Sequence, residues 1–165
     1  GYRNLQMLIG HLLRRSPPRQ PGTEGEPGAP YADSMFGGKG VVPCLLGIQA
    51  FTEQAWAQGF DTVGADQLGN ALIGTQKWIG TLEGVALLRS NGVRAQYVDF
   101  KARQGGGAVR HEQLWKWVRQ YFDEGVEKAP KPQSSDQFLV WREPAVFSSR
   151  PPLYLQHQGH SRTVV

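Results

Sequence analysis

The first sixteen residues, GYRNLQMLIGHLLRRS (1–16), decide how the fold begins. Their large apolar side chains recur three and four residues apart, which places them on one face of an α-helix; they are Leu5, Leu8, Ile9, Leu12 and Leu13. Two prolines follow Ser16, and proline lacks an amide donor and restricts the residue before it. The stretch therefore predicts an amphipathic helix that ends near residue 16.

Three further segments, 41–60, 78–92 and 111–124, have helical patterns. The first has Pro43 near its start and Gly59 at its end, with a predicted buried face of Ile48, Phe51, Ala55 and Trp56. The second closes at Asn91-Gly92, a common helix stop. The third, HEQLWKWVRQYFDE, is the most clearly amphipathic, with an apolar face of Leu114, Trp117, Val118, Tyr121 and Phe122. Residues 61–78 read as a short helix between glycine turns.

Strands are expected mainly towards the end of the chain. Residues 93–100, VRAQYVDF, are β-branched and aromatic and predict one strand. The glycines of 104–109, QGGGAV, predict a loop. Residues 153–158 and 161–165 predict two strands that turn at Gly159. Because helices precede strands, the order predicts an α+β fold with antiparallel strands near the C-terminus.

Two segments lack the composition of packed structure. Residues 16–40 are dominated by proline, glycine and small polar residues, which cannot bury enough apolar surface to offset the entropy of ordering. We expect a disordered insertion there and an irregular connector over 129–150. The length of 165 residues predicts one domain.

Composition narrows the function. The net charge of +4 and pI of about 9.4 allow nucleic-acid binding, but the basic residues are scattered rather than aligned with aromatic side chains, so we expect a solvated surface. A mean hydropathy of −0.43 argues against a membrane span. Cys44 is the single cysteine, and its apolar neighbours predict a buried, inert thiol in a reducing compartment. His157 and His160 lack further ligands at metal spacing, so no metal or cofactor is expected.

A cysteine at a helix start is activated, because the free amides and the helix dipole favour the thiolate. This chain begins with a helix and ends with a histidine in a predicted hairpin, and papain-like enzymes combine these parts. Three blocks carry a family resemblance: GYRNLQML (1–8), IGTQKWIGTLE (73–83) and PPLYLQHQGHSRTVV (151–165). They resemble papain-like proteases for ubiquitin and the ubiquitin-fold modifier, most of all the zinc-finger-containing ubiquitin peptidase (ZUFSP) type.

The resemblance implies the catalytic roles. In that family the first block reads Cys-Gly-Tyr-Arg-Asn and its cysteine is the nucleophile, so the cysteine is expected directly before Gly1 and the triad acid after Val165. The chain is then a protease domain over 1–165 truncated at both ends, inactive by itself. His160 matches the general base, with His157 as its rival, and Gln156 matches the oxyanion donor. Gly1 and Tyr2 match the turn and packing beside the nucleophile. From the residues alone, a histidine such as His160 is more often a surface residue in a turn than a catalytic one, and Gln156 could be a polar strand-edge residue.

The resemblance also implies a substrate site. Ubiquitin ends in an extended tail with two arginines before a glycine pair, so its protease needs carboxylates and a narrow groove. Asp61 and Glu83 match the family's tail-binding acids, and Trp78 matches an aromatic wall over the glycines. The alternatives from the residues are a helix cap for Asp61, a solvated helix position for Glu83 and a core position for Trp78.

The predicted function is removal of ubiquitin from conjugates by a thiol protease of the cytoplasm and nucleus, with ubiquitin or polyubiquitin chains as partner. One alternative is a protease for the ubiquitin-fold modifier, but that branch carries an Asp-Pro-His stretch, where this chain has HQGHSRT. A second is a non-catalytic ubiquitin-binding pseudoprotease. The long segments 17–30 and 134–149 depart from the family pattern, and either could alter how substrate reaches the site.

Overall fold

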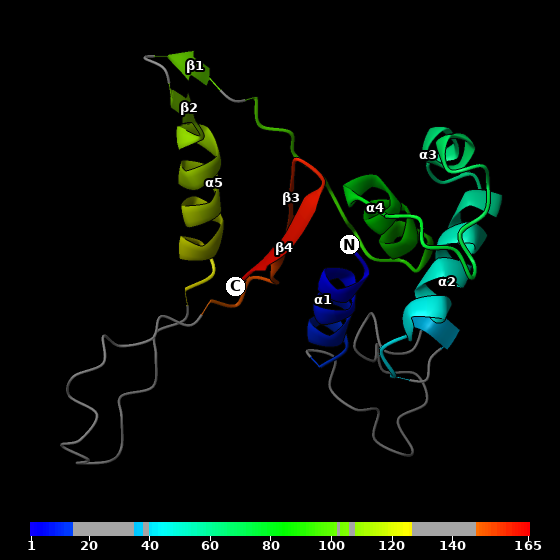
Figure 1. Cartoon of the computed structure of the whole chain (residues 1–165). Coiled ribbons are helices and arrows are strands. Elements are labelled where there is room, and N and C mark those ends of the chain that lie inside the picture. Colours follow the sequence, from blue (N-terminus) through cyan, green and yellow to red (C-terminus); the bar gives the residue numbers. More distant parts are fainter. Residues whose placement is uncertain (15–34, 38–39, 102, 106–107, 127–147) are drawn as a thin grey trace, which may run out of the picture. The chain divides into compact units, whose positions relative to one another are not determined.

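The computed structural model describes residues 1–14, 35–37, 40–101, 103–105, 108–126 and 148–165 (Figure 1). The chain, expected from its length to form one domain, divides into two compact units. Unit 1 comprises Gly1–Tyr97 and Pro151–Val165, and unit 2 comprises Val98–Arg150. The predicted insertion lies mostly outside the described residues, as do residues 129–147 of the predicted connector.

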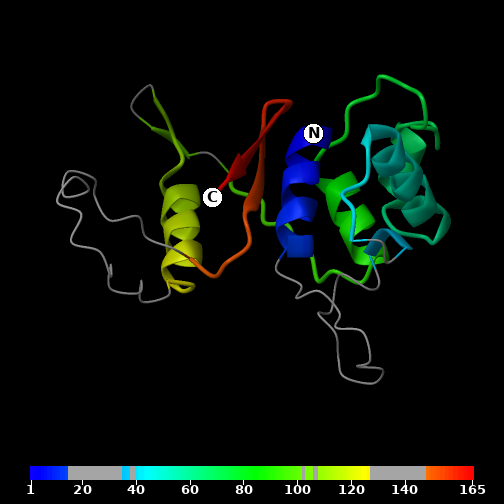
Figure 2. The same cartoon turned by 90° about the horizontal axis from the view of Figure 1, so that it is seen from below.

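The described part of unit 1 consists of helices and one hairpin, as the α+β prediction requires. Its elements are α1 (Tyr2–Arg14), the 3-10 helix η1 (Met35–Gly37), α2 (Leu45–Ala57), α3 (Thr62–Gln67), α4 (Thr81–Ser90), β3 (Leu153–His157) and β4 (His160–Val164). In both Figure 1 and Figure 2, α1 lies between the β3–β4 hairpin and α4. The α+β order, with antiparallel strands at the C-terminal end, is confirmed.

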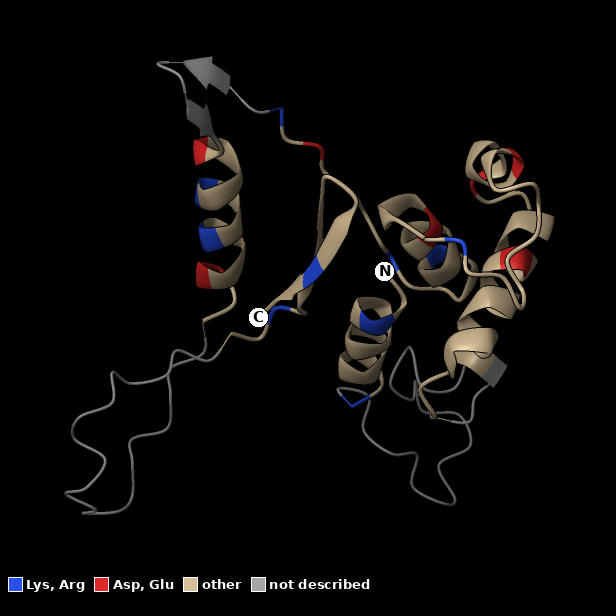
Figure 3. Cartoon of the chain, in the orientation of Figure 1, with Lys and Arg blue, Asp and Glu red and all other residues tan. Residues whose placement is uncertain are grey.

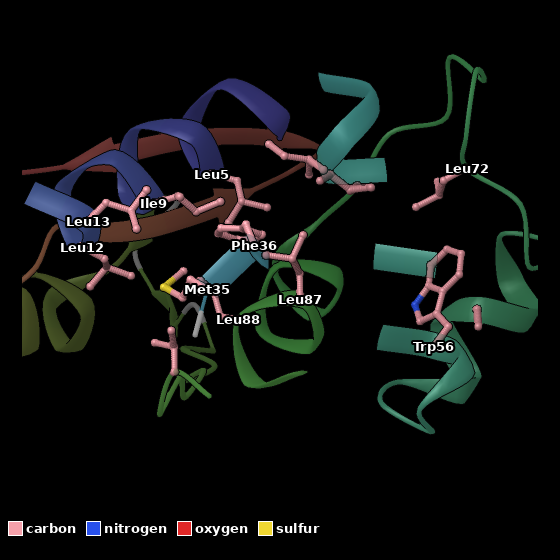
Figure 4. Packing of buried hydrophobic residues seen from close by; sticks show 14 residues of the cluster. Leu5, Ile9, Leu12, Leu13, Met35, Phe36, Trp56, Leu72, Leu87 and Leu88 are labelled. Carbon is pink, nitrogen blue, oxygen red and sulfur yellow. The ribbon is translucent and has the colours of Figure 1, made fainter. Parts of the chain in front are cut away.

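The core of unit 1 forms where α1 faces α4 and η1 (Figure 4). Four of the five predicted apolar side chains of α1 are buried, namely Leu5, Ile9, Leu12 and Leu13, and Leu8 is half-buried. They pack with Leu87 and Leu88 of α4, so the periodicity of residues 1–13 fixed this face correctly. On α2, Ile48, Ala55 and Trp56 are buried as predicted.

The end of the proline- and glycine-rich segment joins this core. Met35 and Phe36 in η1 are buried, and the Phe36 ring meets that of Phe51 edge-on at 4.8 Å between centroids. The Phe36 amide donates to Asn91 Oδ1 over 3.1 Å, which supports its left-handed backbone (φ 53°). The insertion predicted for 16–40 therefore contains an apolar anchor near its end, because two large side chains interrupt its polar composition.

The β3–β4 hairpin has the predicted turn. His157 pairs with His160, and Gln158 and Gly159 between them both have positive φ, as a two-residue type I′ turn requires. Asn4 of α1 holds the hairpin: its Nδ2 donates to Ser161 Oγ over 3.0 Å, and its Oδ1 accepts from Thr163 Oγ1 over 3.2 Å. The hairpin is thus fixed against the first turn of α1.

Unit 2 contains β1 (Arg103–Gly105), β2 (Ala108–Arg110) and α5 (Glu112–Asp123). The side chains of the predicted apolar face of α5 are half-buried, and its other side chains are exposed. Trp117 stacks on Tyr121 with centroids 5.5 Å apart and meets Phe100 at 5.7 Å. Arg150 Cζ lies 5.3 Å from the centroid of the Tyr121 ring, and Arg150 Nη2 pairs with Glu124 Oε2 over 2.7 Å. These two contacts hold Arg150 against the C-terminal end of α5.

Three local predictions are wrong. Residues 93–100 form no strand: the Ala95 carbonyl accepts from Arg89 Nε over 2.7 Å, the Ala95 amide donates to Val93, and no described strand pairs with the segment. The predicted loop at 104–109 contains strand residues of β1 and β2, in which Gln104 pairs with Val109 and Gly105 with Ala108. Cys44 is exposed rather than buried, because it is the N-cap of α2 and its Sγ accepts from the Gly47 amide over 3.4 Å.

Charge is distributed without a continuous basic stripe over the described elements (Figure 3). On α5, the basic Lys116 and Arg119 lie between the acidic Glu112 and Asp123. Among the described helices, none combines the length and apolar character needed to cross a membrane.

Candidate active site

The N-terminal end of α1 lies against the segment that leads into α4. A Cβ atom on Gly1 would lie 2.5 Å from the Ile79 carbonyl oxygen and 2.9 Å from Ile79 Cγ1, closer than real Cβ atoms come. Glycine at position 1 therefore allows the start of α1 and the segment 79–81 to approach. The sequence match that placed Gly1 at a tight turn is consistent with this packing.

Gln156 of β3 reaches the same place from the hairpin. Its Oε1 accepts two hydrogen bonds from Thr81, from the backbone amide over 2.7 Å and from Oγ1 over 2.9 Å. Gly80 leaves room for this side chain, since a Cβ there would lie 2.7 Å from Gln156 Oε1 and 3.1 Å from Nε2. The Gln156 carboxamide oxygen thus completes the N-terminal cap of α4, while Nε2 makes no hydrogen bond to any described residue.

Glu83 caps the same helix from within. Its Oε2 accepts from the Gly80 amide over 2.6 Å, the arrangement of a capping-box residue at the third helical position. Glu83 is half-buried, so the predicted tail-binding acid is not simply a solvated helix residue. One carboxylate oxygen is engaged by the helix, and a carboxylate has further acceptor capacity on the other.

A hydrogen-bond network centred on the buried Gln49 side chain fixes the loop before Trp78. Gln49 of α2, fully buried, accepts from the Gly74 amide over 3.0 Å and donates to the Thr75 carbonyl over 3.0 Å. The same amide group lies 3.4 Å from the Tyr2 hydroxyl, which donates to the Lys77 carbonyl over 3.0 Å. Glu53 Oε1 accepts from the amides of residues 72 and 73. The loop is therefore tied to both α1 and α2.

Trp78 follows this fixed loop and is 77% exposed. The alternative interpretation, that Trp78 is a core residue, is therefore wrong. A large aromatic side chain held at the surface by an anchored backbone can contact an extended peptide without first losing loop entropy. Trp78 precedes Ile79 and Gly80, so it lies beside the place where α1 and α4 begin.

His160 lies at the first position of β4 and is exposed. The register pairs His160 with His157 and Gln156 with Ser161. Because side chains alternate along a strand, His160 shares a face of the hairpin with His157, while Gln156 and Ser161 share the face that contacts α1 and α4. The structure brings Gln156 to the start of α4, whereas no contact described for His160 joins it to Gln156 or to that helix end.

Asp61 occupies the helix-cap position that its residue type allowed. It precedes α3 with φ 49°, and its Oδ1 accepts from the Gly64 amide over 3.2 Å. Gly64 must lack a Cβ, because that atom would overlap the Asp61 carboxylate. Asp61 Oδ2 is buried with no partner among the described residues. No described hydrogen bond connects Asp61 to Glu83 or Trp78.

Sequence reasoning missed the residues that hold the site together, namely Asn4, Gln49, Glu53 and Thr81. None of these four has a local sequence signal; the capping-box spacing, a glutamate three residues after the cap position, indicates only Glu83, which the family resemblance had already indicated. The other contacts join residues far apart in the sequence, such as Thr81 and Gln156, which are 75 positions apart.

The electrostatics of the site favour negative charge at the starts of two helices. The 13-residue α1 and the 10-residue α4 both begin here, and helix N-termini carry partial positive charge. Burial raises the pKa of the nearby Tyr154 phenol; the Ser161 hydroxyl acts against this rise and the negative Glu83 adds to it. In the part of the chain that the structure describes, no three His, Cys, Asp or Glu side chains come together as a metal site would require.

Comparison with known proteins finds relatives over the whole sequence. The model of peptidase family C78 matches residues 1–165. Zinc finger-containing ubiquitin peptidase 1 of Rattus norvegicus is 40% identical over all 165 residues, and that of Homo sapiens is 39% identical. The chain spans 24% of the length of each.

A more distant relative, the ubiquitin carboxyl-terminal hydrolase mug105 of Schizosaccharomyces pombe, is 29% identical over the 165 residues, which cover 52% of its length. The resemblance to the zinc-finger-containing type is therefore confirmed across the whole sequence, including the three blocks around Gly1, Trp78 and His160. The chain belongs to peptidase family C78.

Proposed function

We propose that the full-length protein is a deubiquitinating thiol protease that hydrolyses peptide and isopeptide bonds after the C-terminal glycines of ubiquitin. Membership of peptidase family C78 supports this proposal, as do relatives named as ubiquitin peptidase and ubiquitin hydrolase. The observation that carries it is the position of the Gln156 carboxamide, which sits where α1 and α4 begin, with its oxygen occupied by Thr81.

The proposed fold is papain-like, and the proposed nucleophile is a cysteine immediately before Gly1. There the first amides of α1 would favour its thiolate. The thiolate sulfur attacks the carbonyl carbon of the last ubiquitin glycine, and a new carbon–sulfur bond forms as negative charge moves to oxygen. Nε2 of Gln156 is the proposed donor to that oxyanion.

His160 is proposed to take the thiol proton and then to protonate the leaving lysine amine as the carbon–nitrogen bond breaks. Water, deprotonated by the same imidazole, then hydrolyses the thioester and releases ubiquitin and the free thiol. An acid beyond Val165 would orient His160. The assignment to His160 rather than His157 rests on the family match, because the two side chains leave the same face of the hairpin.

Substrate recognition is proposed to use three groups. The exposed Trp78 ring would cover the paired glycines, and the carboxylates of Asp61 and Glu83 would pair with the two tail arginines. Each carboxylate caps a helix with one oxygen, which fixes its orientation before substrate binds. A location in the cytoplasm and nucleus, where conjugated ubiquitin occurs, is part of the proposal.

The test is labelling of the full-length protein by ubiquitin that carries a thiol-reactive C-terminal group. The expected adduct maps to the cysteine preceding Gly1. His160→Ala should lower the rate of labelling at least about 100-fold, as expected for loss of a general base. The His157→Ala and Cys44→Ser variants should be labelled at the wild-type rate. An adduct on Cys44, or labelling that survives His160→Ala but not His157→Ala, would contradict the assignment.

The same experiment separates the two alternatives. If the protein ignores ubiquitin but reacts with an equivalent probe built on the ubiquitin-fold modifier, it belongs to the other substrate branch. Binding of ubiquitin without reaction with either probe would identify a pseudoprotease.

A further inference from the structure

The orientation of the Gln156 carboxamide is set by one residue of α4. Two hydrogen bonds from Thr81 meet on a single atom, Gln156 Oε1, over 2.7 Å from the backbone amide and 2.9 Å from Oγ1. A backbone amide can only donate, so the oxygen of the carboxamide must face it. The assignment of oxygen and nitrogen therefore follows from chemistry, and a 180° flip would set two donors against each other.

With the oxygen held, the nitrogen is left as the free hydrogen-bond donor of the group. Among the described residues, Gln156 Nε2 makes no hydrogen bond, and its two N–H groups are available to an acceptor. Gln156 itself is exposed, so substrate can reach it. An otherwise mobile glutamine side chain thus keeps one orientation before any substrate arrives, and such preorganisation is what makes an oxyanion donor effective.

The α4 terminus is shaped to receive this side chain. Gly80 has no Cβ, and a Cβ would lie within 2.7 Å of the Gln156 oxygen and 3.1 Å of its nitrogen. The Gly80 amide is already taken by Glu83, so the next free amide, that of Thr81, serves Gln156. The helix behind is anchored by the buried Ala86, Leu87 and Leu88.

We propose that Thr81, together with Gly80, is a positioning residue that holds the Gln156 carboxamide with its N–H groups turned towards the reaction centre. This inference rests on the proposed function, in which Gln156 donates to the oxyanion. Thr81 touches neither substrate nor nucleophile in this role and acts only through Gln156.

The kinetic test uses near-isosteric variants in the full-length protein with a fluorogenic ubiquitin substrate. Thr81→Val keeps the shape and the backbone donor but removes the hydroxyl, and should lower kcat about 3- to 10-fold with KM within about 2-fold, as loss of one hydrogen bond implies. Thr81→Ser restores the donor and should recover most of kcat. The matched control is Thr62→Val, since Thr62 holds the same first helical position in α3 without a described side-chain hydrogen bond.

A double-mutant cycle separates positioning from general damage. In a Gln156→Ala background, Thr81→Val should have no further effect on kcat, because the group that it positions is gone. If the two changes multiply instead, Thr81 acts independently of Gln156 and the proposal is overturned. Equal loss in Thr81→Ser and Thr81→Val would also overturn it.

Hydrogen exchange at the Thr81 amide tests the contact without relying on activity. Gln156→Ala should speed exchange of this amide while the Thr62 amide is unchanged; unchanged exchange at Thr81 would overturn the proposed contact. If exchange responds as expected but the wild-type protein does not cleave ubiquitin, the contact stands, and the proposed function, with the positioning role that depends on it, fails.

Discussion

Asn4 on α1 donates a hydrogen bond from Nδ2 to Oγ of Ser161 on β4 over 3.0 Å, which ties the first turn of α1 to the residue that follows His160. The Oδ1 atom of the same carboxamide accepts from Thr163 Oγ1, so both polar atoms of the Asn4 side chain bind the hairpin. The helix that would follow the nucleophile and the strand that carries the proposed base are therefore connected by three polar residues of α1 and β4.

Asn4→Ala should loosen this connection. It removes two half-buried hydrogen bonds, and we expect the opening free energy of β4 to fall by about 1–3 kcal/mol. Hydrogen exchange of peptides covering residues 160–165 measures it. Arg3→Ala, on the same turn, is the control because Arg3 is exposed and its described contact is a 3.5 Å hydrogen bond to Gln6. Equal protection of β4 in wild type and Asn4→Ala would show that the hairpin is held by packing alone.

Gln49→Leu should destabilise the loop that precedes Trp78. Gln49 is fully buried, and its loss leaves the Gly74 amide and the Thr75 carbonyl without partners, at a cost of about 2–4 kcal/mol. Faster amide exchange over residues 72–78 is the expected result. Gln54→Leu, on the exposed side of the same helix, should change stability by no more than about 0.5 kcal/mol. A loop that stays protected in Gln49→Leu would mean that Glu53 alone suffices.

Trp78→Ala should weaken substrate use without affecting folding. Its side chain is 77% exposed, so truncation removes little core packing, while loss of an aromatic contact on the substrate tail should lower kcat/KM about 10- to 100-fold, mainly through KM. Trp115→Ala is the matched control, since Trp115 is 64% exposed on α5. Steady-state kinetics with ubiquitin substrate and thermal unfolding give the two readouts. A fall in melting temperature with unchanged KM would return Trp78 to a structural role.

Tyr154 should make stability depend on pH in the alkaline range. Its pKa is raised in the folded state, mainly by burial, so folding favours the neutral phenol. This contribution is complete below the unfolded pKa of about 10 and is lost as pH rises through the higher folded value. Comparing the melting temperatures of wild type and Tyr154→Phe across this range, we expect wild type to lose stability relative to the variant above about pH 10. A constant difference would show that the phenol titrates alike in both states.

The local patterns of the sequence predicted the elements whose signal lies within one segment. The spacing of Leu5, Ile9 and Leu12 predicted α1 and its buried face, and Gly159 predicted the hairpin turn. The prediction of a strand at 93–100 was wrong because its signal was not purely local. β-branched residues favour extended backbone, but a strand also needs a neighbouring strand to pair with, and only the tertiary structure provides one.

The candidate site divides in the same way. Residue matches alone pointed to Gln156, Trp78 and Glu83, but they could not show that the side chain proposed as oxyanion donor also caps a helix. That contact needs Thr81 and Gln156 side by side across 75 positions, and the hydrogen bond that holds the hairpin needs Asn4 and Ser161 together across 157. Likewise, the apolar neighbours of Cys44 suggested burial, although the helix that they begin faces solvent there.

The sequence by itself determined which segments are helical, which face of α1 is buried and which family the chain belongs to, because periodicity and residue identity are carried by the order of residues. Only the tertiary structure decided which polar groups meet. A hydrogen bond requires donor and acceptor within about 3 Å and in line, and that condition is met only when α1, α4 and the β3–β4 hairpin are packed around one core.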